Sequence, residues 1–211
     1  MYVLGLTGSI AMGKSWGASC FRRLNIPVHD SDACVHKLLG AGGQAVERVL
    51  AAFPGVENSQ GGVDRYKLSA SVFGHDSALD LLEYLLHPLV RDAQFQFLAQ
   101  NARAQTPIVV LDIPLLFETR AQNRVDGVVV MTAPADLQYV RALARPNMTL
   151  DKLHAIMRRQ MPDPLKRLGA DFVIQTGQSK LCSFLQIQKV VKSVQQKTGK
   201  VWGPGWAHVG K

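Results

Sequence analysis

Short apolar runs and amphipathic segments alternate over the first quarter of the chain. Tyr2–Thr7 is an apolar run typical of a buried strand, Ser15–Leu24 follows a helical period, and Ile26–His29 is a second short apolar run. Two further helices are predicted over Asp32–Leu39 and Gly43–Phe53. This βαβα order predicts an α/β fold built on a parallel sheet.

The middle of the chain lacks strand signals. Arg65–Phe73 and Asp76–Gln105 both have helical patterns, and together they predict a helical insert in the α/β fold. Because proline has no backbone N–H and cannot continue the helical hydrogen-bond ladder, we expect the second helix to be interrupted at His87-Pro88.

The sheet resumes after this insert. Ile108–Leu111, Val125–Met131 and Phe172–Ile174 are short apolar runs of the kind that is buried on both faces of a parallel sheet. Between the last two runs, helices are predicted over Pro134–Ala144 and Thr149–Gln160. Their arrangement around a short break resembles a hinged lid.

The C-terminal segment contains one more amphipathic helix. Ser179–Lys197 keeps its large apolar residues near one helical face, so we expect this helix to dock on the sheet. Gly203-Pro204-Gly205 is expected to end the ordered structure. Trp202 and Trp206 then either pack against the domain or lie free in the tail.

The composition fits one compact domain with a smaller insert. The chain has 211 residues, 47% of them apolar, but no segment approaches the ~18 uninterrupted apolar residues of a membrane span. Cys20, Cys34 and Cys182 lack C-x-x-C or metal-ligand spacing, which predicts reduced thiols and neither a zinc site nor a disulfide. We therefore expect a cytoplasmic protein.

Positive charge is concentrated late in the sequence. The formal net charge is +8; residues 141–167 contribute +5 and residues 178–211 contribute +6, so the remainder sums to −3. A basic protein can bind nucleic acid. Here we interpret the first basic segment as a phosphate-facing cover and the tail lysines as a solvated helix face, with no nucleic-acid partner.

A candidate phosphate-binding loop follows the first predicted strand directly. The stretch Gly8-Ser9-Ile10-Ala11-Met12-Gly13-Lys14-Ser15 has the spacing in which backbone N–H groups and the next helix N-terminus surround an anion. In such a loop Lys14 reaches the β- and γ-phosphates, and the Ser15 hydroxyl ligates Mg²⁺. The alternative is a chance Gly/Ser turn before a helix. The strand and helix on either side favour a nucleoside triphosphate site.

Two predicted strands end in acidic residues. Asp30-Ser31-Asp32 ends the second strand, and ligands of open parallel sheets lie outside the carboxyl ends of the strands. A carboxylate there can orient an acceptor alcohol and take its proton, a role that we assign to Asp32. The alternative is that both acids only cap the following helix. Asp112 ends a later strand and either joins the magnesium shell or merely starts a loop.

Two arginines mark the entrance to the predicted lid. Arg141 and Arg145 lie four residues apart on one helical face, where either guanidinium can brace charge on a transferred phosphoryl group. The alternative is that they are ordinary surface arginines. His87-Pro88 likewise either contacts a substrate or only terminates a helix.

Several motifs together closely resemble the dephospho-CoA kinase family, over nearly the whole chain. They are Leu6-Thr7-Gly8, Gly13-Lys14-Ser15, Ile26-Pro27-Val28-His29-Asp30-Ser31-Asp32, His87-Pro88 and Asp112-Ile113-Pro114-Leu115-Leu116-Phe117-Glu118. Gln160-Met161-Pro162 with Lys166 also falls in the family's order. The run from Asp112 to Glu118 is specific to this family among small P-loop kinases.

The resemblance implies a single α/β P-loop kinase domain over residues 1–211, with three layers in α/β/α order around a parallel sheet. It implies a nucleotide core over 1–32, 106–140 and 168–211, a helical CoA-binding insert over about 33–105, and a lid over about 141–167. The implied reaction is ATP-dependent phosphorylation of the ribose 3′-hydroxyl of dephospho-CoA, the last step of coenzyme A synthesis. ATP and Mg²⁺ are the implied cofactors. The chain is expected to act as a monomer that does not associate with a membrane.

The resemblance also implies roles for individual residues. Asp32 would be catalytic, together with Lys14 and either Arg141 or Arg145. The nucleotide loop would comprise Gly8, Ser9, Ala11, Met12, Gly13, Lys14, Ser15 and Trp16, and the metal contacts would be Ser15 and Asp112. The residues toward the acceptor would be Thr7, Asp32, His87, Pro88, Leu116, Phe117 and Glu118.

The loop departs from the family pattern at four positions. Ser9 and Ala11 stand where glycines are usual, Met12 where a small residue is usual, and Trp16 where a threonine is usual. Ala11 costs about 1 kcal/mol or more if its backbone must be left-handed. The Trp16 indole must point away from the α-phosphate or stack beside the nucleotide. Two other functions stay open: another P-loop small-metabolite kinase, and a nucleotide-dependent binding protein without turnover.

Overall fold

The computed structural model describes residues 1–203 and 206, which form two compact units. The sheet unit comprises Met1–His29 and Leu98–Lys211, and the helical unit comprises Asp30–Phe97. Each unit has its own apolar core. Within the described residues, none of the helices is both long and apolar enough to cross a bilayer.

The sheet has five strands in the order β2-β3-β1-β4-β5. Their bounds are Tyr2–Thr7 (β1), Val28–Asp30 (β2), Ile108–Asp112 (β3), Gly127–Thr132 (β4) and Phe172–Gln175 (β5). β1 pairs in parallel with both β3 and β4, and β4 pairs in parallel with β5. Leu6 is in register with Asp112, so the carboxyl ends of β1 and β3 meet at the same edge of the sheet.

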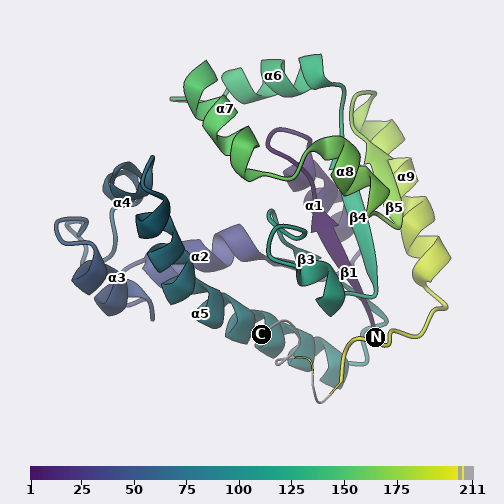
Figure 1. The fold of residues 1–211 in the computed structure, drawn as a ribbon. Coiled ribbons are helices and arrows are strands. Elements are labelled where there is room, and N and C mark those ends of the chain that lie inside the picture. Colours follow the sequence, from purple (N-terminus) through teal and green to yellow (C-terminus); the bar gives the residue numbers. More distant parts are fainter. Residues whose placement is uncertain (204–205, 207–211) are drawn as a thin grey trace. The chain divides into compact units, whose positions relative to one another are not determined.

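The two faces of the sheet are covered by different segments. Leu4 and Leu6 of β1 join a core with Phe21 of α1 (Lys14–Arg23) and Ile187 of α9 (Lys180–Val194). Gly5 lies on the opposite face, where a Cβ atom would come within 2.5 Å of the Leu116 side chain. The sheet is therefore the middle layer, with α1 and α9 on one side and the segment after β3 on the other (Figure 1).

Three further helices of the sheet unit follow β4. They are α6 (Ala135–Leu143), α7 (Leu150–Arg159) and α8 (Asp163–Leu168). Figure 1 shows α6 and α7 as a pair lying over the loop between β1 and α1. Helices α6 and α7 were predicted from the sequence, whereas α8 and the short 3₁₀ helix Ala121–Arg124 were not. Pro164 lies in the first turn of α8, where its missing N–H costs no hydrogen bond.

The helical unit consists of α2 (Ser31–Leu39), α3 (Val46–Ala52), α4 (Arg65–Val72) and most of α5 (Asp76–Arg103). Its core includes Leu38, Val49, Leu68 and Leu86, one from each of these helices. The predicted run of helices without strands is confirmed for this part of the chain.

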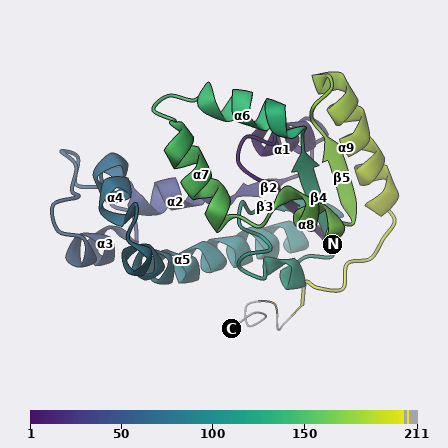
Figure 2. The ribbon, with the colours of Figure 1, turned by 45° about the horizontal axis from the view of Figure 1, so that its top comes forward.

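The predicted interruption at His87-Pro88 is wrong. α5 continues through Pro88 as one helix of 28 residues (Figure 2). A proline removes only one hydrogen bond from the ladder, and its ring disfavours the helix by about 3 kcal/mol. Leu82 and Leu86 are buried just before it, and Leu89 and Val90 pack against the same core just after it. Apolar packing on both sides of the proline outweighs its local cost.

The predicted docking of the last helix is confirmed. α9 packs against β5 and α1, and Ile187, Val190 and Val194 are buried. The expected end of ordered structure at Gly203-Pro204-Gly205 lies partly outside the described residues. Beyond it, Trp206 is 2% exposed, and its indole N–H donates to the Arg124 carbonyl at 3.0 Å, so this residue packs against the sheet unit.

The three cysteines carry free thiols. Burial raises the pKa of the Cys20 thiol, and it also raises the pKa of the Cys34 thiol. Both groups are therefore held in the protonated form that reacts slowly with oxidants.

Candidate functional site

Two glycines shape the loop between β1 and α1. At Gly8 a Cβ atom would lie 2.7 Å from the Met131 carbonyl oxygen, so no side chain fits where the loop crosses β4. Gly13 has a φ of 90° and is the residue before the first turn of α1. A left-handed residue at this point turns the chain into the helix and leaves the helix N-terminus facing the loop.

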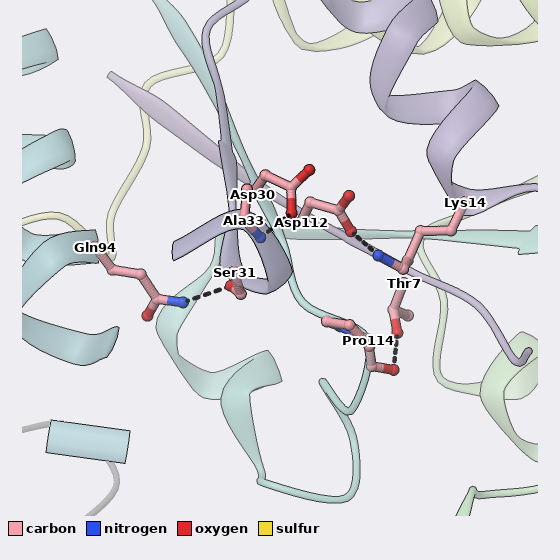
Figure 3. A network of polar contacts seen from close by, with 8 residues as sticks. All are labelled: Thr7, Lys14, Asp30, Ser31, Ala33, Gln94, Asp112 and Pro114. Atoms are coloured by element: carbon pink, nitrogen blue, oxygen red, sulfur yellow. Dashed lines mark hydrogen bonds and ion pairs between the residues drawn. The ribbon is translucent and has the colours of Figure 1, made fainter. Parts of the chain in front are cut away.

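Lys14 and Asp112 form an ion pair at the carboxyl edge of the sheet. Lys14 Nζ lies 2.7 Å from Asp112 Oδ1, and the Asp112 side chain is only 2% exposed (Figure 3). The parallel register of β1 and β3 brings these residues together although they are 98 positions apart. Asp112 thus places a negative charge next to the Lys14 ammonium group.

The loop region contains oxygen ligands suited to magnesium. Ser15 is exposed in the first turn of α1, directly after Lys14, which contacts the Asp112 carboxylate. Hydroxyl and carboxylate oxygens are the hard ligands that Mg²⁺ prefers, and this ion usually completes its shell with phosphates and water. Among the described residues there is no group of three or more His, Cys, Asp and Glu side chains that could hold a metal.

The bulky residue Met12 fits into the fold through three contacts. Its Sδ accepts a hydrogen bond from the Ala133 N–H at 3.1 Å, and its carbonyl accepts one from Thr176 Oγ1 at 2.9 Å. Its N–H donates to the Ser9 carbonyl at 3.1 Å. Met12 is 3% exposed, so its side chain fills the space between the loop and the end of β4.

Ala11 adopts the conformation that makes alanine costly in this loop. Its φ is 62°, in the left-handed region, which costs an L-residue about 1–2 kcal/mol. The methyl group is buried with Ala142 of α6 and Leu153 of α7. Removing such a group from water contributes about 0.8 kcal/mol, which offsets much of the backbone cost.

Trp16 points its indole toward α9. The indole N–H donates to Ser183 Oγ at 3.0 Å, and the Arg23 and Lys180 side chains lie over the ring at 5.0 and 5.2 Å from its centroid. The indole is thus held in the interface between α1 and α9.

The two candidate arginines have different environments. Arg141 Nη1 donates to Thr176 Oγ1 at 3.0 Å and Nη2 donates to the Thr176 carbonyl at 2.7 Å. Arg145 lies just after α6 and is exposed. Arg141 is thus fixed to the residue that also holds Met12, whereas the Arg145 side chain is presented to solvent.

The candidate acceptor residues of the sheet unit make internal contacts. Thr7 is fully buried and its hydroxyl donates to the Pro114 carbonyl at 3.0 Å (Figure 3). Leu116 is fully buried under Gly5, and Phe117 packs against Gly169. These three residues hold the segment after β3 against the sheet.

Glu118 connects this segment to α8 and to the residues just before it. Glu118 Oε1 accepts a hydrogen bond from the Met161 N–H at 2.7 Å and lies 2.9 Å from Lys166 Nζ. Lys166 is fully buried, and its contact with Glu118 is an ion pair without the direction of a good hydrogen bond. Because a buried ammonium group needs a counter-charge, this pair fixes α8 to the segment after β3.

In the helical unit, Asp30 and Asp32 have different environments at the start of α2. Asp30 Oδ1 accepts a hydrogen bond from the Ala33 N–H at 3.0 Å and caps α2, while the buried Ser31 hydroxyl accepts one from Gln94 at 3.2 Å (Figure 3). Asp32 lies in the first turn of α2 and is exposed. The capping alternative is therefore confirmed for Asp30. His87 and Pro88 are exposed in the middle of α5.

Sequence reasoning assigned no role to Gln138, Gln160, Thr176 and Lys166. Gln160 and Lys166 were noticed only as part of the resemblance. Each of the four contacts a residue between 35 and 164 positions away. Burial of a polar residue such as Gln138 is the sign of such a contact, and it becomes visible only in the folded chain.

Comparison with known proteins agrees with this architecture. The dephospho-CoA kinase family profile matches residues 2–181. A dephospho-CoA kinase from Paramagnetospirillum magneticum is 58% identical over 79% of this chain and 78% of its own length, and one from Mesorhizobium japonicum is 50% identical over 94% and 100%. A solved dephospho-CoA kinase from Campylobacter jejuni superposes with a TM-score of 0.66 at 26% identity, covering 92% of this chain and 97% of its own. By sequence and by its P-loop kinase fold, the chain belongs to the dephospho-CoA kinase family.

Proposed function

We propose that this chain transfers the γ-phosphoryl group of ATP to the ribose 3′-hydroxyl of dephospho-CoA, giving CoA and ADP in the final step of coenzyme A synthesis. The observation that carries the proposal is the Lys14–Asp112 ion pair, because it joins the phosphate loop to the first residue of the family-specific run 112–118. The match to the dephospho-CoA kinase family over residues 2–181 supports the choice of acceptor.

The triphosphate binds at the loop between β1 and α1. Backbone N–H groups of the loop and the positive end of α1 provide the anion site. Lys14 exchanges the Asp112 carboxylate for oxygens of the β- and γ-phosphates, so one cation serves both states. The buried Thr176 hydroxyl and Arg141 keep the far end of the loop in place through the Met12 carbonyl.

Magnesium would be held by the Ser15 hydroxyl and the Asp112 carboxylate. The ion would neutralise negative charge on the transferred phosphoryl group. The residues contribute oxygen ligands of the correct hardness, and Asp112 is kept rigid by its burial at the end of β3.

The acceptor hydroxyl is oriented by Asp32. Its carboxylate is exposed in the first turn of α2, where Asp30 already serves as the cap. Asp32 accepts the 3′-hydroxyl proton as the oxygen attacks the γ-phosphorus and the bond to the β-phosphate oxygen breaks, so that ADP leaves. His87 and Pro88 contact the CoA part of the substrate from the exposed side of α5. Thr7, Leu116, Phe117 and Glu118 support the acceptor site indirectly, by holding the segment that follows β3.

Arg145 supplies the positive charge that braces the transferred group. We assign this role to Arg145 because its side chain is exposed, whereas Arg141 is committed to Thr176. A guanidinium suits this task because its planar fork of donors matches phosphoryl oxygens.

The test is coupled ADP release by the purified protein with ATP and Mg²⁺, adding dephospho-CoA, adenosine, AMP or shikimate separately. We expect turnover with dephospho-CoA and formation of CoA. Turnover with a different acceptor only would replace the proposal by another small-metabolite kinase. ATP binding without turnover on any acceptor would indicate a nucleotide-dependent binding protein.

The same enzyme is proposed to act as a cytoplasmic monomer without a nucleic-acid partner. Sedimentation analysis with and without substrates tests the oligomeric state. A mobility-shift assay at physiological salt tests the basic tail, because purely electrostatic binding weakens steeply as salt rises.

A further inference from the structure

Ile10 of the phosphate loop is held at both its N–H and its carbonyl by side chains from α6 and from the end of α7. The Ile10 N–H donates to Gln160 Oε1 at 2.9 Å, just after the end of α7. The Ile10 carbonyl accepts a hydrogen bond from Gln138 Nε2, also at 2.9 Å, from within α6. The two glutamines are 150 and 128 positions from Ile10, so only the fold brings them together.

An apolar contact accompanies these two hydrogen bonds. Ala11 is buried with Ala142 and Leu153, while Ile10 and Met157 pack against the same cluster. Gln138 is only 4% exposed, so its amide group contacts the loop and is shielded from water. Neighbouring loop residues thus meet α6 and α7 through both polar and apolar groups.

We propose that Gln138 and Gln160 are positioning residues for nucleotide binding, because they couple the two peptide groups on either side of Ile10 to α6 and to the end of α7. Neither peptide group can rotate without breaking its hydrogen bond to a glutamine. The glutamines therefore hold the first half of the loop in the arrangement seen here. The second half is held separately, by Thr176 at Met12. The inference rests on the proposed function only where turnover is measured.

The two glutamines act in opposite senses, and this provides a sharp test. Gln160 is the acceptor, since its partner is an N–H group, whereas Gln138 is the donor, since its partner is a carbonyl. A glutamate keeps the acceptor and loses the donor. Gln160→Glu should therefore preserve its contact, and Gln138→Glu should lose it and bring a carboxylate against the Ile10 carbonyl.

The experiment compares Gln160→Ala, Gln160→Glu, Gln138→Ala and Gln138→Glu in the full chain. We expect the Kd for ATP by calorimetry to rise about three- to tenfold in Gln160→Ala, as for loss of one neutral hydrogen bond, and to stay within about twofold in Gln160→Glu at a salt concentration that screens the added charge. Gln138→Glu should bind ATP more weakly than Gln138→Ala. In turnover, the KM for ATP should rise while the KM for dephospho-CoA stays unchanged.

A second measurement does not depend on ATP or on activity. NMR-detected hydrogen exchange at the Ile10 amide should lose protection in Gln160→Ala and retain it in Gln160→Glu. The matched control is Gln186→Ala, which removes a similar pair of contacts, at 2.9 and 3.3 Å, to the N–H and C=O of Gln175. It should leave both the ATP Kd and the Ile10 amide unchanged.

Three outcomes would overturn the proposal. The first is an ATP Kd equal to that of the wild type in both alanine variants. The second is equal impairment of Gln160→Ala and Gln160→Glu in binding and exchange. The third is a Gln186→Ala control that weakens ATP binding as much as Gln138→Ala and Gln160→Ala do. If Gln138→Ala does not fold because Gln138 is buried, the comparison of Gln160→Ala with Gln160→Glu decides, since Gln160 is partly exposed. Calorimetry separates these results from failure of the proposed function, which would abolish turnover in the wild type as well.

Discussion

The sheet unit and the helical unit hold their candidate functional residues in different ways. In the sheet unit, Lys14 is bonded to Asp112 across 98 positions, and Arg141 to Thr176 across 35. In the helical unit, Asp30 is bonded to Ala33 three positions away, and Asp32 and His87 are exposed. The difference teaches that contacts between distant segments fix the candidate nucleotide residues of the sheet unit. The candidate acceptor residues Asp32 and His87 lie at the surface of the helical unit.

The largest effect is expected at the centre of the long-range network. Lys14→Met removes the cation that serves first Asp112 and then the phosphates, so we expect kcat/KM for ATP to fall by about 10³-fold. Steady-state kinetics measures the loss. Lys189→Met, at an exposed lysine of α9, is the matched control and should keep the wild-type rate. A Lys14→Met enzyme within tenfold of the wild type would contradict the role given to the ion pair.

The next effect concerns the acid that the helical unit exposes. Asp32→Asn should retain ATP binding and lower kcat by about 10²-fold, because the group that accepts the hydroxyl proton is lost while the phosphate site is intact. Asp30→Asn, two positions earlier, still caps α2 and should leave both stability and rate close to the wild type. Equal kcat values for Asp32→Asn and Asp30→Asn would contradict the different roles given to these two acids.

A smaller effect should separate the two arginines. Arg145→Ala is expected to lower kcat by about tenfold with little change in the KM for ATP, because it removes a charge that acts on the transferred group. Arg141→Ala should instead raise the KM for ATP, because Thr176 and the loop lose their brace. Measuring kcat and KM for both variants decides the assignment. An exchanged pattern would give the phosphoryl contact to Arg141.

The smallest effect is expected at Ala11. Ala11→Gly relieves a left-handed backbone worth about 1–2 kcal/mol, but it loses a buried methyl worth about 0.8 kcal/mol and makes the unfolded chain more flexible. These terms nearly cancel, so the free energy of unfolding should change by less than about 1 kcal/mol in a urea titration. A loss above about 2 kcal/mol would mean that the methyl contact with α6 and α7 is worth more than its area indicates.

Much of the sheet unit could be predicted because its signals are local. The apolar runs of β1, β3 and β4 are buried on both faces, as such runs are in parallel sheets. The spacing of Gly8, Gly13 and Lys14 identified the loop because it is a pattern of a few neighbouring residues, and Gly13 answers a local requirement for a left-handed backbone. Pro88 shows where local reasoning fails: the packing of Leu82, Leu86 and Leu89 decided the continuity of α5.

By itself, the sequence determined the order of the strands and of the longer helices along the chain, the phosphate loop, and the identity of the acids at the strand ends. These depend on side-chain periodicity and on backbone restrictions that act over a few residues. Only the tertiary structure decided where the Trp16 indole points and that Gln138 and Gln160 hold Ile10. Each of these outcomes depends on a hydrogen-bond partner that comes within reach only once distant segments have packed and excluded water.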